Sequence, residues 1–154
     1  MRKLEQLISA LESNISHQEL IVPDISAGSV GWHIEHSLLV LNLVIGTLSK
    51  SDPSNYKKKF DIRRAAVLLI GKIPRGKIRA PKAVQPTTEF NRDSLQQHVH
   101  RTRDSLKTLE RLSPGHYFTH PFLGDFKLAP AIKFLTIHTK HHYQIIQDIV
   151  GNKQ

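Results

Sequence analysis

The chain has 154 residues, a formal net charge of +9 and no cysteine. This length is typical of one domain with a core of its own, so we expect a single domain over residues 1–154. The lack of cysteine excludes disulfides, thiolate metal sites and an internal thiol nucleophile, so any metal ion must be bound by His, Asp or Glu.

Helical periodicity dominates the first third of the chain, and neither repeats nor long alternating strand patterns are found. Apolar residues recur at helical spacing over residues 2–15, which predicts a first helix. After a loop, Ser26 or Ser29 can cap a second helix that extends to about Ser49. The core-facing seam predicted for this helix consists of Trp32, His36, Leu39 and Leu43.

The middle of the chain predicts a short helix over residues 60–71 and then a long, irregular connection rich in proline and glycine. Asn91 can cap a third long helix that extends to about Leu112. Its predicted seam consists of Leu95, Val99, Thr102, Leu106 and Leu109. A loop containing His120 then leads to the last helix, which Gly151 ends.

The last helix, in the apolar stretch 129–150, has the clearest pattern. Its core-facing positions recur at steps of four, three, four, three and four: Ala131, Leu135, His138, His142, Ile145 and Ile149. Such a seam is typical of an inward-facing helix in a bundle. Four long helices, with one long crossover connection between helices 2 and 3, predict an all-α four-helix bundle.

Two histidines of the last helix suggest a metal site. His138 and His142 are four residues apart, so a helix places both imidazoles on one face, about 5–6 Å apart at Cβ. Burying them without partners would cost on the order of 1–3 kcal/mol each, and a shared metal ion would satisfy both. His36, in phase with the second helix, is the third ligand we expect; His33 could replace it or support it. The alternative is a bundle whose histidines are hydrogen-bonded and bind no metal.

The positions of the other histidines make them weaker candidates for metal ligands. His141 lies off the seam, and we interpret it as a surface residue or a support for the ligands. His98 and His100 flank the seam of the third helix, where we expect them to be solvated. His120 could reach the open end of the bundle; with His141 and Tyr143 it is a candidate proton carrier, and no general base is assigned.

Two motifs in this sequence resemble the DinB-like superfamily, in particular its YfiT-like metal-dependent hydrolase type. They are Ser-Val-Gly-Trp-His-Ile-Glu-His at 29–36 and His-Thr-Lys-His-His-Tyr-Gln at 138–144. The stretches 74–84 and 120–124 are similar to one branch of that superfamily. The resemblance covers residues 28–150.

The resemblance implies a DinB-like four-helix bundle in which one His of the second helix and a His-x-x-x-His pair of the last helix bind a divalent metal ion. By position these are His36, His138 and His142, the same three residues that the periodicity selects. Zinc or nickel is implied first, with manganese or iron as alternatives. The resemblance also implies a small-molecule substrate, a low-molecular-weight thiol in the thiol S-transferases, and a possible homodimer.

Three imidazoles leave a divalent ion at least one open position, as in catalytic sites. Such an ion can lower the pKa of a bound water to about 7, or bind an external thiol as the thiolate. The motif is not the His-Glu-x-x-His of zinc peptidases, because Thr139 follows His138. We therefore expect a metal-dependent hydrolase or thiol S-transferase rather than a peptidase.

The positive charge is concentrated in one segment. Residues 57–82 contain ten Lys or Arg and one acid, Asp61, which accounts for the whole net charge of +9. This segment could guide an anionic substrate, bind nucleic acid through phosphates, or serve solubility alone. Tyr56 and Phe60 are its only nearby aromatic residues, and no DNA-reading motif is found, so nucleic acid is disfavoured. A non-enzymatic anion- or nucleic-acid-binding module is the alternative function.

The N-terminal residues and the apolar runs predict where the protein is located. Residues 1–5 lack the apolar core of a signal peptide. The longest apolar run, 38–45, is interrupted by Asn42 and is too short to span a bilayer. We therefore expect a cytoplasmic protein without a membrane segment.

Overall fold

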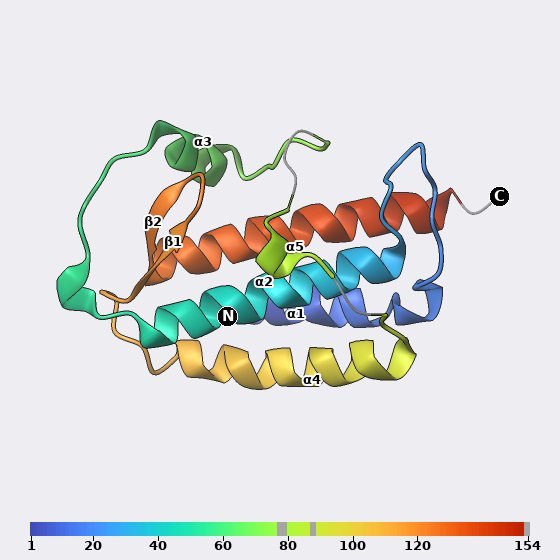
Figure 1. The fold of residues 1–154 in the computed structure, drawn as a ribbon, viewed down its shortest axis with the longest axis horizontal. Coiled ribbons are helices and arrows are strands. Elements are labelled where there is room, and N and C mark those ends of the chain that lie inside the picture. The colour runs from blue at the N-terminus through green and yellow to red at the C-terminus, as the bar shows by residue number, and fades with distance from the viewer. Residues whose placement is uncertain (77–79, 87–88, 153–154) are drawn as a thin grey trace.

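Four main helices lie side by side in an elongated bundle (Figure 1). The computed structural model describes residues 1–76, 80–86 and 89–152. The main helices are α1 (Arg2–Glu12), α2 (Val30–Lys50), α4 (Arg92–Leu109) and α5 (Leu128–Gly151). The predicted all-α bundle with a long crossover between the second and third main helices is confirmed. Within the described ranges, none of the helices has the length and apolar character that crossing a bilayer would require.

Side-chain hydrogen bonds cap the N-termini of α2 and α4 at positions that the sequence predicted. The Ser29 hydroxyl accepts a hydrogen bond from the Trp32 backbone N–H at the start of α2, so Ser29 rather than Ser26 is the N-cap. Asn91 caps α4 in a reciprocal arrangement with Ser94, as its sequence position predicted. These caps satisfy N–H groups that have no partner within the helix.

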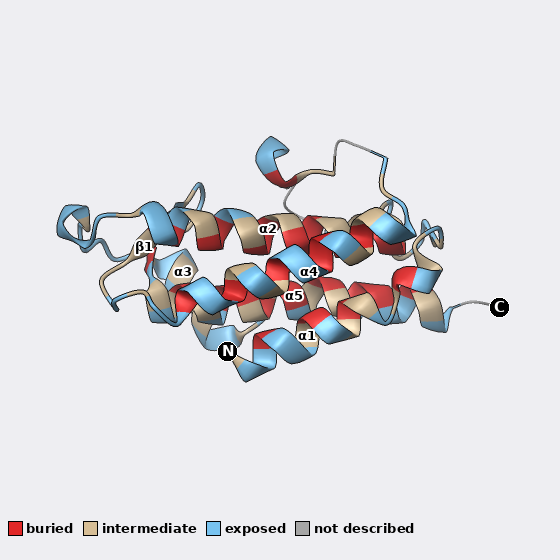
Figure 2. Cartoon of the chain, turned by 90° about the horizontal axis from the view of Figure 1, so that it is seen from below, coloured by how far each residue is buried: buried red, intermediate tan, exposed pale blue. Residues whose placement is uncertain are grey.

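The bundle core is formed by the inward faces of these helices (Figure 2). α2 packs against both α4 and α5, and α1 packs against α5 and α4. All five seam positions predicted for α4 are buried, and in α5 only His138 of the predicted seam is partly exposed. The periodicity of these two helices therefore predicted their core faces correctly.

The predicted seam of α2 is wrong in phase. Leu43 is 49% exposed, and Trp32 and Leu39 are only partly buried. The residues of α2 that enter the bundle core are Ile34, Leu38, Leu41, Ile45 and Leu48. The prediction failed because α2 is apolar on two faces: one packs in the core, and the other, with Trp32 and His36, lines a cavity. Two apolar faces give no single helical period.

A β-hairpin replaces the loop predicted before α5. Strands β1 (Tyr117–His120) and β2 (Gly124–Lys127) pair antiparallel, with Phe118 opposite Phe126. Both phenylalanines are buried, and their rings stack with centroids 5.1 Å apart. Each strand has only four residues, too few for an alternating pattern to be recognised.

The crossover between α2 and α4 folds back over one side of the bundle (Figure 1). It contains α3 (Ile62–Ile70), close to the predicted short helix, which packs against α5. Its later part has a 3₁₀ turn at Lys82–Val84 that packs on α2 and buries Val84. Two further 3₁₀ turns lie at Ile15–His17 and Pro53–Asn55. The crossover thus brings backbone of residues 80–84 next to His36.

Candidate metal centre

Three histidines converge where α2 packs against α5. His36 comes from α2, and His138 and His142 come from successive turns of α5. One ring nitrogen of each lies within 4.8 Å of the others. The ring centroids of His36 and His138 are each 4.6 Å from that of His142 and 5.1 Å from each other. The structure therefore brings together the three residues selected from the sequence; their binding of a metal stays a prediction.

The His36 ring is held in one orientation by two contacts. Its Nδ1 donates a hydrogen bond of 2.7 Å to the backbone carbonyl of Val84. Because a carbonyl can only accept, the proton of a neutral His36 lies on Nδ1, and Nε2 keeps its lone pair. The Trp32 ring stacks on His36 with centroids 5.0 Å apart and planes 13° apart. His36 thus has the tautomer and the fixed ring that a metal ligand requires.

His33 supports His142 from behind. The two Nδ1 atoms are 2.9 Å apart, and Nε2 of His33 lies 2.9 Å from the Ser26 hydroxyl oxygen. When His142 donates from Nδ1 and His33 donates from Nε2 to Ser26, both bonds are satisfied and Nε2 of His142 is left with its lone pair. Of the two roles considered for His33, the structure therefore favours support of the site over replacement of His36.

His138 completes the group with an unpaired nitrogen. Its Nδ1 is buried, and no hydrogen-bond partner lies among the residues that the structure describes. A buried polar atom without a partner costs on the order of 1–3 kcal/mol. An imidazole whose Nδ1 has no described protein partner, next to two other imidazoles, fits a residue that binds a metal ion.

Burial keeps these imidazoles uncharged. It lowers the pKa of His33 to about 4, with smaller contributions from His36, His141 and Arg75. It is also the main cause of the lowered pKa values of His36, His138 and His142, and neighbouring imidazoles lower those of His138 and His142 further. At neutral pH the group is therefore in the neutral form that binds metal ions.

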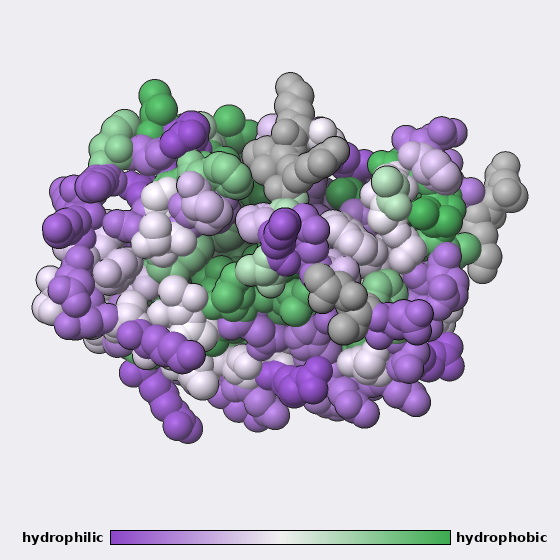
Figure 3. All heavy atoms as spheres, viewed as in Figure 1, coloured by the Kyte–Doolittle hydropathy of each residue, from purple (hydrophilic) through white to green (hydrophobic). Residues whose placement is uncertain are grey.

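The three histidines open into a cavity of about 440 Å³. It lies between α2, α3, the β-hairpin, α5 and the described part of residues 73–84. Hydrophobic side chains surround a hollow at this place in the space-filling view (Figure 3). A concave, mostly apolar space with a few convergent polar groups is typical of a small-molecule site.

His120, a candidate proton carrier, lines this cavity from the hairpin. Its Nδ1 accepts a hydrogen bond of 3.1 Å from the Phe122 backbone N–H, so a neutral His120 carries its proton on Nε2. Burial lowers its pKa, and its ring packs edge-on against Phe134. His141 also lines the cavity, whereas Tyr143 packs against the hydrophobic core.

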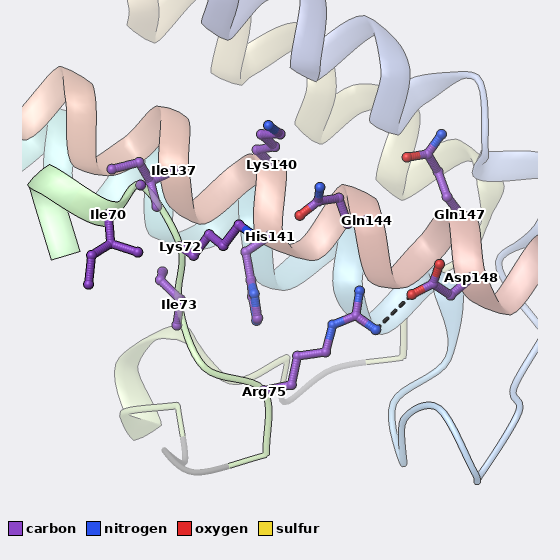
Figure 4. Close-up of a pocket in the computed structure, with 11 residues that line it drawn as sticks. Ile70, Lys72, Ile73, Arg75, Ile137, Lys140, His141, Gln144, Gln147 and Asp148 are labelled. Carbon is purple, nitrogen blue, oxygen red and sulfur yellow. Dashed lines mark hydrogen bonds and ion pairs between the residues drawn. The ribbon is translucent and has the colours of Figure 1, made fainter.

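A second, more polar groove of about 520 Å³ runs along α5 beside the cavity (Figure 4). His141 and Ile73 border both spaces. The cationic side chains of the groove are Lys72, Arg75 and Lys140, and Arg75 forms an ion pair of 2.7 Å with Asp148. Among the described residues, charged side chains therefore lie beside the cavity rather than in its lining.

His98 is not solvated, contrary to the prediction, whereas His100 is exposed. The His98 Nδ1 lies 2.9 Å from a Glu35 carboxylate oxygen, and its Nε2 lies 3.0 Å from the Asn42 amide nitrogen, which also donates to Thr102. Polar partners on α2 make this burial tolerable. Glu35 lies one residue before His36 and Asn42 six residues after it. This spacing could have indicated a polar network on another face of α2.

Sequence reasoning also missed two supports of the candidate site. The Val84 carbonyl is a backbone group, so no residue type announces its role. Ser26 was considered only as a helix cap, but its hydroxyl contacts His33 and accepts from the Gly28 N–H. A serine two residues before a glycine in a loop carries no signal of such a contact.

Comparisons with known proteins point to one family. A family model described as the DinB superfamily matches residues 3–146, which include the three clustered histidines. A search of curated proteins and a search of solved structures each found no significant match. The match covers most of the chain and includes parts of all four main helices.

Proposed function

Because this chain belongs to the DinB superfamily, we propose that it is a metal-dependent enzyme acting on a small molecule. In this proposal His36, His138 and His142 bind one divalent ion, zinc or nickel before manganese or iron. The observation that supports it most is the convergence of three ring nitrogens within 4.8 Å on a cavity. Neutral, buried imidazoles are the ligand type that these metals accept.

A divalent ion at this place would act as a Lewis acid that activates a water or a thiol. The protein residues would fix the geometry around it. The Val84 carbonyl and His33 hold the rings of His36 and His142 in the orientation described above. Trp32 covers one side of His36, and the apolar cavity wall limits the access of water.

Of the three candidate proton carriers, we assign His120 the role of a neutral hydrogen-bond donor, because its tautomer is fixed. It lines the cavity, and no carboxylate is among the described residues of that lining. Its Nδ1 already accepts a hydrogen bond from a backbone N–H. Its Nε2–H can therefore donate a hydrogen bond to a substrate atom and stabilise negative charge that develops there, while the ring itself stays neutral. This role suits a hydrolase or a thiol S-transferase; because the chain has no cysteine, the thiol would be external.

The alternative, a non-enzymatic anion- or nucleic-acid-binding module at residues 57–82, has less support. Arg63 pairs with Asp61, Arg75 pairs with Asp148, and Arg64 donates to the backbone carbonyls of Lys59 and Asp125. Three of the cationic side chains in this segment therefore already interact with other groups of the protein. Lys77 and Arg79 lie outside the described residues. DNA binding that weakens steeply with salt would favour this alternative.

Elemental analysis of untagged protein tests the proposed function. We expect about one metal ion per chain in the wild type and none in His142→Ala. His98→Ala is the matched control, because it removes another mostly buried imidazole (each 8% exposed) outside the group. It should keep the metal, and circular dichroism should show helical folding in all three proteins. Full occupancy in His142→Ala would refute the ligand assignment. No metal in any of them after incubation with zinc, nickel or manganese would refute the enzyme proposal.

A further inference from the structure

We propose that the cavity beside the three histidines binds an uncharged, apolar part of the substrate, such as an aromatic ring or a branched or cyclic alkyl group. This inference rests on the proposed function, because it assumes that the reacting end of the same molecule faces the histidines. It goes beyond that function by naming the chemical class of the substrate. We refer to the cavity as the chamber.

Every element that surrounds the chamber contributes apolar side chains to its wall. Val40 and Val44 come from α2, Val67 from α3, Phe118 and Leu123 from the hairpin, and Phe134 from α5. The polar side chains that line it are the histidines and two threonines, Thr47 and Thr119. No Asp, Glu, Lys or Arg is among the described residues that line it. A charged group inside would lose its hydration without gaining an ionic partner.

The size of the chamber fits such a ligand. Its volume of about 440 Å³ lies within the range of roughly 300–1,000 Å³ typical of small-molecule sites. Long, hydrophilic molecules would leave their polar groups against valine and phenylalanine side chains. A compact apolar group would instead exchange water contacts for close packing.

The cations of this region that the structure describes lie outside the chamber; Lys77 and Arg79 are not among the described residues. Lys72, Arg75 and Lys140 line the neighbouring groove, which Ile73 and His141 separate from the chamber (Figure 4). In that view the Arg75 side chain extends toward Asp148, with which it pairs. The described positive charges therefore lie against the groove and not against the apolar walls.

A tryptophan in the chamber can report the binding of a ligand. Trp32 is the single tryptophan of the chain, it lines the chamber, and its ring stacks on His36. A ligand that displaces water from the chamber changes the surroundings of this indole. Tryptophan fluorescence therefore measures occupancy without any assay of activity.

Titration with probes of equal size tests the inference. Cyclohexylmethanol is the uncharged probe, and cyclohexanecarboxylate and cyclohexylmethylamine are its anionic and cationic counterparts. In chelator-treated protein, where a carboxylate cannot bind a metal, we expect cyclohexylmethanol to cause a saturable blue shift of Trp32 emission. Both charged probes should bind at least tenfold more weakly. No saturable shift, or equal affinity for the three probes, would overturn the proposal.

Two variants show where the probe binds. Leu43 and Phe122 line the chamber and are each 49% exposed, so Leu43→Asp and Phe122→Asp place a charge there without opening the bundle core. Ile21 is 50% exposed and is not among the chamber residues, so Ile21→Asp is the matched control. We expect at least tenfold weaker binding of cyclohexylmethanol in at least one chamber variant that circular dichroism shows to be folded. Wild-type affinity in both, or an equal loss in Ile21→Asp, would refute the assignment.

The outcomes separate the two proposals. One metal ion per chain without probe binding would leave the proposed function in place and refute the chamber's ligand class. Probe binding without any metal would support the apolar chamber and refute the metal-dependent enzyme. Each protein is therefore measured for both metal content and probe affinity.

Discussion

The helix α2 contributes to two polar clusters, each with at least one buried histidine, which differ in the partners of the ring nitrogens. On one face, His36 and His33 meet His138 and His142 of α5. On another, Glu35 and Asn42 contact His98 of α4. We call these the open cluster and the closed cluster. In the closed cluster both ring nitrogens of the histidine have protein partners, and one partner is a carboxylate.

In the open cluster that compensation is incomplete: His33 and His36 have hydrogen-bond partners, but none of these partners is a carboxylate. The open cluster contains only imidazoles, one of which has a buried nitrogen with no partner among the described residues, and it borders a cavity. The comparison shows that burial of a histidine does not indicate a metal site. What indicates one is the convergence of imidazole lone pairs on a space that a ligand can enter.

The largest expected effect is the response of the open cluster to acid. Unfolded His33 takes up a proton near pH 6.5, whereas the folded residue resists it until about pH 4. The unfolded state therefore binds more protons between these values, and the free energy of unfolding falls as the pH is lowered through this window. At about 1.4 kcal/mol per pH unit, His33 alone accounts for a loss of about 3 kcal/mol. Urea denaturation of chelator-treated protein from pH 7.5 to 4.5 measures it.

The variant His33→Asn is the control for that measurement. Asparagine does not titrate, so the pH slope between 6.5 and 4 should be flatter by about 1.4 kcal/mol per pH unit than in the wild type. An unchanged slope would mean that His33 is not held neutral by burial.

A smaller effect should separate ligands from their supports within the open cluster. His33 contacts His142 but is not part of the group of three ring nitrogens. Loss of such an outer contact costs about 10–100-fold in metal affinity, so His33→Asn should weaken zinc binding by this factor and retain one site per chain. Competition with a chromophoric chelator measures the affinity. Complete loss of zinc would instead identify His33 as a ligand.

Much of the fold could be predicted because most main helices have one apolar face. The seams of α4 and α5 follow from this, and Ser29 and Asn91 mark two helix starts. The phase of α2 could not be predicted, since its cavity face also contains large apolar residues, among them Val40, Leu43 and Val44. The hairpin was missed because strands of four residues carry too little pattern.

The candidate site was predictable where it depends on spacing within one helix. His138 and His142 are one turn apart, so their proximity is local and follows from the sequence. His36 was selected from a seam whose phase was wrong, and it reaches the group because it lies on the cavity face of α2. The burial of His98 was missed because its partners Glu35 and Asn42 lie in another helix, where only their spacing indicates a polar face.

The smallest expected effect tests whether the closed cluster is purely structural. Glu35→Gln keeps the size of the side chain but replaces a carboxylate acceptor for His98 by a neutral amide. A charge-assisted hydrogen bond contributes more than a neutral one, so the free energy of unfolding should fall by about 1 kcal/mol. Metal content and the response of Trp32 to cyclohexylmethanol should be those of the wild type, although Glu35 is adjacent to His36 in sequence. Urea denaturation, elemental analysis and fluorescence titration measure the three quantities. Loss of the metal in a folded Glu35→Gln protein would show that the two faces of α2 are coupled, and the distinction between the clusters would then fail.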